Sequence, residues 1–166
     1  MKALLSAHRM HAEAIGKWDG DPSPRGEGDQ PPADRPLIYQ YFLHGELCWR
    51  SRPDIRIEVK ALLDTGCDIS SVSMNTVERL DAMLQESTGE MLQLFRTQLA
   101  AGAPRPTYDL AFLLPETGHP VSSTSGFLCL PNPGWGTVDM LLGQDLINQW
   151  IITYDGIHGT LTIAIP

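Results

Sequence analysis

Asp64 is the residue of this sequence whose surroundings most strongly suggest chemistry. It ends the apolar run at residues 61–63 and is followed by Thr65 and Gly66. A carboxylate at the end of an apolar strand must be hydrogen-bonded, paired or neutralised, because leaving it dry and unpartnered is expensive. Thr65 offers a hydroxyl, and Gly66 allows the backbone to bring N–H groups close to the acid. Such an arrangement holds an acid in a fixed place at a cost in stability, which is typical of functional sites.

The tripeptide alone is weak support for a site, because an Asp two residues before a Gly is common in ordinary turns. Cys67 could act as a nucleophile, although a small side chain that fills a tight turn is the simpler interpretation. His8 and His11 have a spacing that suits a metal, but no carboxylate or Cys is placed to complete that site. We therefore expect no metal and no cofactor.

Composition excludes several classes of function. The chain has 166 residues, of which 42% are hydrophobic and 19% are charged, as expected for one globular domain with a tail. Its net charge of −8 argues against a nucleic-acid partner, because phosphate contacts need clustered Lys and Arg. No apolar run is long enough to span a bilayer. The three cysteines are widely spaced and odd in number, so a disulfide framework is not indicated.

The first 36 residues differ in pattern from the rest. Residues 1–9 begin like a signal peptide, but the apolar stretch is too short, and we expect a soluble, cytoplasmic protein without a membrane partner. Apolar side chains at helical spacing predict a helix within residues 1–17, read as a surface or partner-docking segment. Residues 19–36 are rich in Pro, Gly and charge, as in a linker. We therefore divide the chain into an N-terminal extension, 1–36, and a folded domain, 37–166.

The folded domain has the patterns of an all-β protein with one or two short helices. Residues 54–60 alternate between apolar and charged side chains, and 61–63 are apolar on both faces, as in a strand that enters a core. Evenly spaced short strands suggest a closed barrel or a sandwich. The expected elements are a hairpin at 37–52 turning at or near His44-Gly45, a strand at 54–64, a helix at 73–85 capped by Ser73 or Asn75, a hairpin at 91–114 with its tip at 100–104, a strand at 121–131, a loop at 131–137, a short buried strand at 138–142, a short helix at 144–150 and a terminal hairpin at 151–166.

Three segments together resemble a known family. The apolar-apolar-Asp-Thr-Gly sequence at 62–66 is followed about eighty residues later by Leu141-Leu142-Gly143 and a short helix, and a hairpin with a small-residue tip lies between them. This order and spacing resembles the retroviral-type (retropepsin-like, single-lobe) aspartic proteases and their cellular relatives. The resemblance covers about residues 37–166. It implies a closed single-lobe barrel in which the central hairpin is a flap.

The resemblance also implies roles for individual residues. Asp64 would be the catalytic aspartate, Thr65 would hydrogen-bond across a subunit boundary, and Gly66 would let the loop approach the acid and the substrate. The remaining matched positions are Asp68 in substrate binding, Ala100, Ala101 and Gly102 at the flap tip, and Leu141, Leu142 and Gly143 packed beneath the catalytic loop.

Two positions depart from the family pattern. Cys67 stands where the family usually has Ala, which exchanges one small side chain for another. Gln144 stands where retroviral members carry an Arg that pairs with an acid at the position of Asp68. An amide leaves at best a hydrogen bond between a neutral and a charged group in place of that ion pair. We therefore expect the dimer to be held in part by another contact, and the long terminal hairpin is our candidate.

The chemistry that the resemblance implies needs two carboxylates that share one proton. One acts as a base on a water molecule, and the other, protonated, polarises the scissile carbonyl. The chain has a single Asp-Thr-Gly. We therefore predict a symmetric homodimer that cleaves a peptide or protein substrate. Asp139 and Asp145 are the rival candidates for a second acid within one chain, which we disfavour.

Two other functions remain open at this stage. The domain could be a protease-like binding or dimerisation module with little or no activity, or a self-processing element that trims its own linker. Trp135 is a further open question, because it could line a substrate pocket or cover the core. Trp150 is expected in the core, and His158 in solvent.

Overall fold

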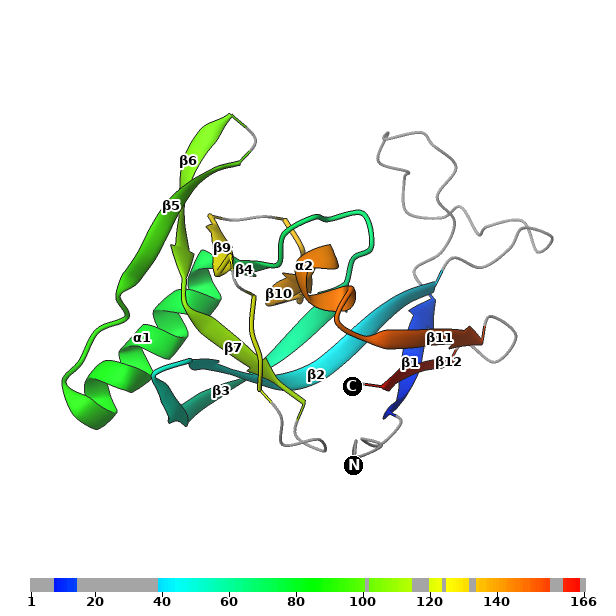
Figure 1. Ribbon diagram of the computed structural model, residues 1–166. Helices are drawn as coiled ribbons and strands as arrows, with labels where there is room; N and C mark the ends of the chain where they lie inside the picture. The colour runs from blue at the N-terminus through cyan, green and yellow to red at the C-terminus, as the bar shows by residue number, and fades with distance from the viewer. Residues whose placement is uncertain are drawn as a thin grey trace, which may run out of the picture.

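The computed structural model describes residues 8–14, 39–100, 102–114, 120–123, 125–131, 134–155 and 160–164. Within them the chain forms twelve strands and two helices, so the expected mostly β class is confirmed (Figure 1). No helix in these residues is both long enough and apolar enough to cross a membrane. The elements are β1 (His8–Ala14), β2 (Tyr39–Trp49), β3 (Arg52–Leu63), β4 (Ser71–Ser73), α1 (Met74–Thr88), β5 (Leu94–Ala100), β6 (Ala103–Tyr108), β7 (Leu110–Leu113), β8 (Pro120–Val121), β9 (Phe127–Leu130), β10 (Met140–Leu142), α2 (Gln144–Ile147), β11 (Ile151–Asp155) and β12 (Thr160–Ala164).

The strands form one mixed sheet in the order β11-β12-β1-β2-β3-β10-β4-β9-β6-β5, with β7 beside β2 and β8 beside β7. Among the described strands, no pairing joins β11 to β5, so the expected closed barrel is not seen. The spacing of strands along a sequence predicts how many strands form. It does not predict whether the two outer strands hydrogen-bond to each other.

The centre of the sheet places distant segments side by side. β10 lies between β3 and β4, parallel to β3 and antiparallel to β4. In this register Leu142 is opposite Leu63, the last residue before Asp64. β4 in turn runs parallel to β9. The Asp-Thr-Gly segment therefore leaves the sheet directly beside the Leu-Leu-Gly segment, as the sequence motifs require.

α1 covers one part of this sheet and has clear boundaries in the sequence. Ser73 caps its start, because the side-chain oxygen accepts the N–H of Thr76 at 3.2 Å. Gly89 ends it with a left-handed backbone (φ 74°). Val77, Leu80 and Leu84 share one face and are buried, and α1 packs on β3, β4 and β9. The predicted helix and one of its two predicted caps are confirmed.

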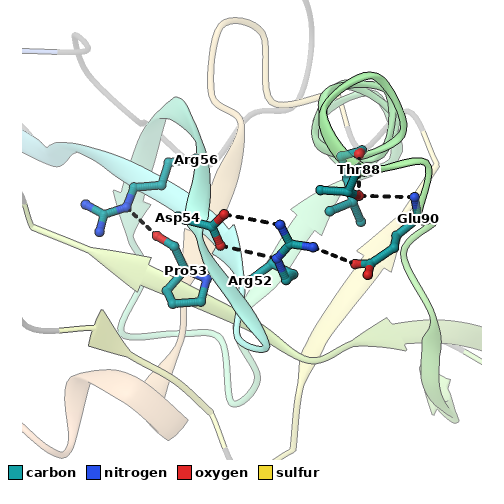
Figure 2. A network of polar contacts seen from close by, with 7 residues as sticks. Arg52, Pro53, Asp54, Arg56, Thr88 and Glu90 are labelled. Atoms are coloured by element: carbon teal, nitrogen blue, oxygen red, sulfur yellow. Dashed lines mark hydrogen bonds and ion pairs between the residues drawn. The ribbon is translucent and has the colours of Figure 1, made fainter.

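A surface network joins the end of α1 to the start of β3 (Figure 2). The guanidinium of Arg52 donates to Glu90 at 3.0 Å and to both carboxylate oxygens of Asp54 at 3.3 and 3.2 Å. The hydroxyl of Thr88 donates to the carbonyl of Leu84 at 2.8 Å and accepts the N–H of Glu90 at 3.1 Å. Ion pairs at the surface add little stability. The network therefore mainly orients the chain between α1 and β5.

Residues 8–14 form a strand, so the predicted helix is wrong for these residues. β1 pairs with β12 through residues 8–11 and with β2 through residues 12–14. Helical spacing in a short segment is outweighed here by two sheet edges that the sequence does not reveal. Residues 1–7 and 15–17 and the linker at 19–36 lie outside the described residues, and the division of the chain at residue 36 stays a prediction.

The first hairpin turns later than predicted. β2 continues through His44 and Gly45 to Trp49, and the turn lies at Arg50 and Ser51. Gly45 has a packing role instead, because a Cβ there would lie 2.6 Å from ring atoms of Phe112 and from the carbonyl oxygen of Leu113 in β7. The glycine therefore permits β7 to pack closely on β2.

Two predicted strands are each divided in the structure. The second half of the 91–114 hairpin changes partner at Asp109, since β6 pairs with β5 and β9 whereas β7 pairs with β2 and β8. The predicted strand at 121–131 is interrupted before β9, where Gly126 has a left-handed backbone (φ 75°). Alternation of apolar and polar residues does not predict where a strand changes the neighbouring strand with which it pairs. The short strand β10, the helix α2 and the terminal hairpin β11–β12 agree with prediction.

Candidate active site

Asp64 opens a loop that folds back onto its own acid. Its N–H donates to the carbonyl of Leu142 at 3.0 Å, and its carbonyl accepts the N–H of Cys67 at 3.2 Å. Its side-chain Oδ1 accepts the N–H of Gly66 at 2.9 Å. A Cβ on residue 66 would lie 3.3 Å from that oxygen, so the glycine permits the approach. The carboxylate is fixed by a backbone N–H while it stays partly exposed.

The start of α2 holds this loop through its backbone. The N–H of Gln144 donates to the carbonyl of Cys67 at 2.8 Å, and that of Asp145 donates to the carbonyl of Asp68 at 3.2 Å. The side-chain amide of Gln144 donates to the carbonyl of Thr65 at 2.8 Å. The sequence led us to expect Asp68 as the partner of Gln144. The structure instead places the amide on the backbone next to the catalytic candidate.

Ser70 and Asp145 form a clamp at the end of the loop, which sequence reasoning missed. Oδ1 of Asp145 accepts the N–H and the hydroxyl of Ser70, at 2.8 and 2.6 Å. The Ser70 hydroxyl also accepts the N–H of Gly143 at 2.9 Å. Oδ2 of Asp145 is buried and has no hydrogen-bond partner among the described residues. Asp145 therefore joins the end of the loop to the start of α2 through Ser70.

We expect Ser70→Ala to destabilise the protein by about 2 kcal/mol, because it removes one hydrogen bond to a carboxylate and leaves the Gly143 N–H buried without its acceptor. Ser71→Ala is the matched control. Ser71 is also buried, but among the described residues its hydroxyl makes a single bond, to the carbonyl of Ile69 at 3.2 Å. Urea unfolding of the three proteins measures the difference, and equal losses would contradict the clamp.

Gly143 precedes α2 and lies close against the loop. A Cβ there would lie 2.7 Å from the backbone carbon of Ile69, 2.8 Å from the carbonyl oxygen of Cys67 and 2.9 Å from the nitrogen of Ser70. Leu142 is fully buried and Leu141 is 9% exposed. Gly143 therefore packs against the Asp64 loop, and the role of Leu141, Leu142 and Gly143 in supporting the site stays a prediction.

Asp139 has a structural role. Its carboxylate accepts the N–H of Lys60 at 2.8 Å, the hydroxyl of Thr76 at 3.1 Å and the guanidinium of Arg79 at 2.9 Å. It therefore joins β3, α1 and the chain that enters β10. Neither its carboxylate nor that of Asp145 hydrogen-bonds to Asp64 among the described residues. A second acid within one chain has no support from these contacts.

Cys67 is poorly suited to be a nucleophile. Burial, followed by the charges of Asp64, Asp145 and Asp68, raises the pKa of its thiol. The thiol donates to the carbonyl of Ile69 at 3.0 Å. A raised pKa keeps the group protonated, and the thiolate is the reactive form. Cys67 is therefore a small side chain in a tight loop, as the simpler interpretation predicted.

The β5–β6 hairpin projects beyond the rest of the described chain (Figure 1). Ala100 pairs with Ala103 at its end, and Gly102 has a left-handed backbone (φ 75°). Phe95 and Leu99 are exposed, Leu99 by 78%. Ala101 lies outside the described residues. A hairpin with a small-residue tip thus forms where the resemblance implies a flap, and its action as a flap stays a prediction.

Trp135 lines a cavity of about 480 Å³ with Ser73, Asn75 and Asp139 among its other walls. This cavity lies at the start of α1, beyond the end of β4 that is farther from the Asp64 loop. Trp150 is buried in the core, as expected, whereas His158 lies outside the described residues. Within the described part of the chain, no group of three or more His, Cys, Asp and Glu side chains could hold a metal ion.

No protein-family model matches the sequence, and no curated protein matches it. The structure is similar to a retropepsin-like aspartic protease from Rickettsia conorii, at 13% identity over 76% of this chain and 83% of that chain, with a TM-score of 0.46. It is also similar to the retroviral protease-like domain of Ddi1 from Leishmania major, at 17% identity over 75% and 94% of the two chains, with a TM-score of 0.45. Both are retropepsin-like domains.

Proposed function

We propose that this protein is an aspartic endopeptidase that hydrolyses peptide bonds as a homodimer. The observation that carries the proposal is the Asp64 loop itself. Its carboxylate is held by the Gly66 N–H at 2.9 Å, at the end of a buried strand, and the loop is fixed from below by α2. A carboxylate that is partly exposed and yet rigidly oriented is suited to general acid–base work.

The proposed mechanism uses Asp64 from each of two subunits. One carboxylate takes a proton from a water molecule, whose oxygen attacks the scissile carbonyl carbon. The other, initially protonated, donates a hydrogen bond to the carbonyl oxygen as negative charge develops there. The tetrahedral intermediate then collapses as the C–N bond breaks, and the amine leaves with the proton that the first carboxylate took from water. Two adjacent carboxylates share one proton readily, because the negative charge on one disfavours ionisation of the other.

The other matched residues take supporting roles in this proposal. Thr65 would contact the partner loop, and Asp68 would bind the backbone of an extended substrate. The hairpin tip at residues 100–102 would close over the peptide and exclude water. The general test is a peptide library offered to the purified protein between about pH 4 and pH 7. Cleavage that is lost on removal of the Asp64 carboxylate supports the proposal, and a protein that cuts nothing in this range contradicts it.

We propose that β11 provides the contact between subunits. Among the described strands it pairs only with β12, so its other edge is open. Ile151 and Tyr154 on this strand are 64% and 50% exposed. Residues 151–154 carry no charge and no Pro, which are usual protections of a free edge, and the acid of the strand, Asp155, stands at its end. β11 also follows α2 along the chain, and α2 contacts the Asp64 loop through the N–H groups of Gln144 and Asp145.

We expect Ile151→Lys to weaken dimerisation by about tenfold or more, because a charge would be buried in the new strand pair. Sedimentation velocity over a range of protein concentrations measures the effect. Met83→Lys is the control, because Met83 is an exposed apolar residue of α1 (43%). A dimer that withstands the Ile151 change as well as it withstands the Met83 change would rule out the β11 contact.

A further inference from the structure

Gln144 contacts the Asp64 loop with its main chain and its side chain. The main-chain N–H donates to the carbonyl of Cys67, and the side-chain amide donates to the carbonyl of Thr65, both at 2.8 Å. The carbonyl of Thr65 and the N–H of Gly66 belong to the same peptide unit. That N–H donates to Oδ1 of Asp64 at 2.9 Å. One peptide unit is therefore held by the Gln144 amide at its oxygen and by Asp64 at its nitrogen.

We propose that Gln144 is a positioning residue that orients the Asp64 carboxylate through the Thr65–Gly66 peptide unit. This inference rests on the proposed peptidase function. A donor on the carbonyl of a peptide unit polarises its N–H and strengthens the hydrogen bond that the N–H makes. It also prevents the peptide plane from rotating away from the acid. Gln144 begins α2 and directly follows the Leu142–Gly143 segment, whose Leu142 is buried. The orientation of the acid therefore depends on the position of that segment.

The donor to Thr65 is a neutral amide in an acidic surrounding. The loop from Asp64 to Ser70 and the helix α2 contain three acids, Asp64, Asp68 and Asp145, and no basic residue. An amide does not titrate, so its hydrogen bond to Thr65 is the same at every pH at which the protein is folded. This contact therefore persists through the pH range in which the Asp64 pair would change its protonation.

The first test removes the donor. We expect Gln144→Leu to lower kcat by about tenfold with little change in KM, since the acid is misoriented while the residues proposed to bind substrate are unchanged. The Gly66 amide should exchange faster with solvent in this variant, which NMR measures without substrate. Gln149→Leu is the matched control, because the Gln149 amide also donates to a carbonyl, that of Asp145 at 2.7 Å, but not to the loop.

The second test uses Gln144→Glu, whose side chain can donate to Thr65 only when it is protonated. The carbonyl of Thr65 and the negative charges of Asp64, Asp68 and Asp145 disfavour the carboxylate, so the pKa of the new Glu in the folded protein should exceed its ordinary value of about 4.3. A raised folded pKa means that the variant matches the native protein at low pH and loses stability relative to it as the pH rises. Its relative kcat should follow the same course.

The outcomes separate this inference from the proposed function. Faster Gly66 exchange in Gln144→Leu but not in Gln149→Leu, together with the pH-dependent stability of Gln144→Glu, supports the positioning role even if no substrate is cleaved. Absence of cleavage by the unmodified protein would then count against the peptidase proposal alone. Unchanged Gly66 exchange and unchanged kcat in Gln144→Leu would overturn the positioning role.

Discussion

Asp64→Asn is expected to abolish peptide hydrolysis, by about 10³-fold or more, and to leave the fold unchanged. The Asn side-chain oxygen can still accept the Gly66 N–H, so the loop keeps the hydrogen bond that is now 2.9 Å long. What is lost is the ability to hold and move a proton. Cleavage of a library-derived peptide and the unfolding midpoint, measured side by side, separate loss of chemistry from loss of structure.

A mixing experiment extends this result to the dimer. We consider an equal mixture of native and Asp64→Asn chains after subunit exchange. If each site needs Asp64 from both subunits, the mixture should have about one quarter of the activity of native protein at the same total concentration. Independent subunits would instead give about one half. Asp54→Asn, which alters an exposed acid of the Arg52 network, is the control. An equal mixture of native and Asp54→Asn chains should keep the full activity. An activity of one half would refute the shared site.

Gly143→Ala is expected to destabilise the protein by about 3 kcal/mol or more, because the added carbon has no space that a side-chain rotation could provide. All three of its nearest neighbours are backbone atoms of the loop, at 2.7 to 2.9 Å. Either α2 or the loop must move. Movement would also break the hydrogen bond from Gly143 to Ser70 and the one from Gln144 to Cys67. Urea unfolding and the peptidase assay should both register the change.

Gly102→Ala is the comparison for that variant. Gly102 has a left-handed backbone (φ 75°), but among the described residues, its chain neighbours apart, no atom lies within 4 Å of a Cβ placed there. The expected loss is therefore about 1–2 kcal/mol, from backbone strain alone. If Gly143→Ala proved as mild as this, the close contact between α2 and the Asp64 loop would not be required for the fold.

Most helices and strands could be predicted from local sequence patterns. The alternation at residues 54–60 and the apolar residues after it predicted β3, and the Ser73 cap and the spacing of Val77, Leu80 and Leu84 predicted α1. The terminal hairpin also forms as its local sequence pattern predicted. These signals are local, because the caps, turns and periodicities that specify an element lie within it.

The errors arose where the partner of a segment decided its structure. Residues 8–14 form a strand because they pair with the edges of β2 and β12. Gly45 lies within β2, where the ring of Phe112 packs against it. The order of the sheet and the lack of closure between β11 and β5 depend on pairings between distant segments. No local pattern contains that information.

The sequence by itself determined that an acid follows a buried strand, that a glycine stands two residues later, and that a Leu-Leu-Gly segment follows far along the chain. The tertiary structure alone decided how the acid is held. The Ser70–Asp145 clamp, the contacts of Gly143 and the bond from Gln144 to Thr65 all join residues more than seventy positions apart. Hydrogen bonds of this range depend on which strands lie side by side, and only the folded sheet, with β10 between β3 and β4, brings them within reach.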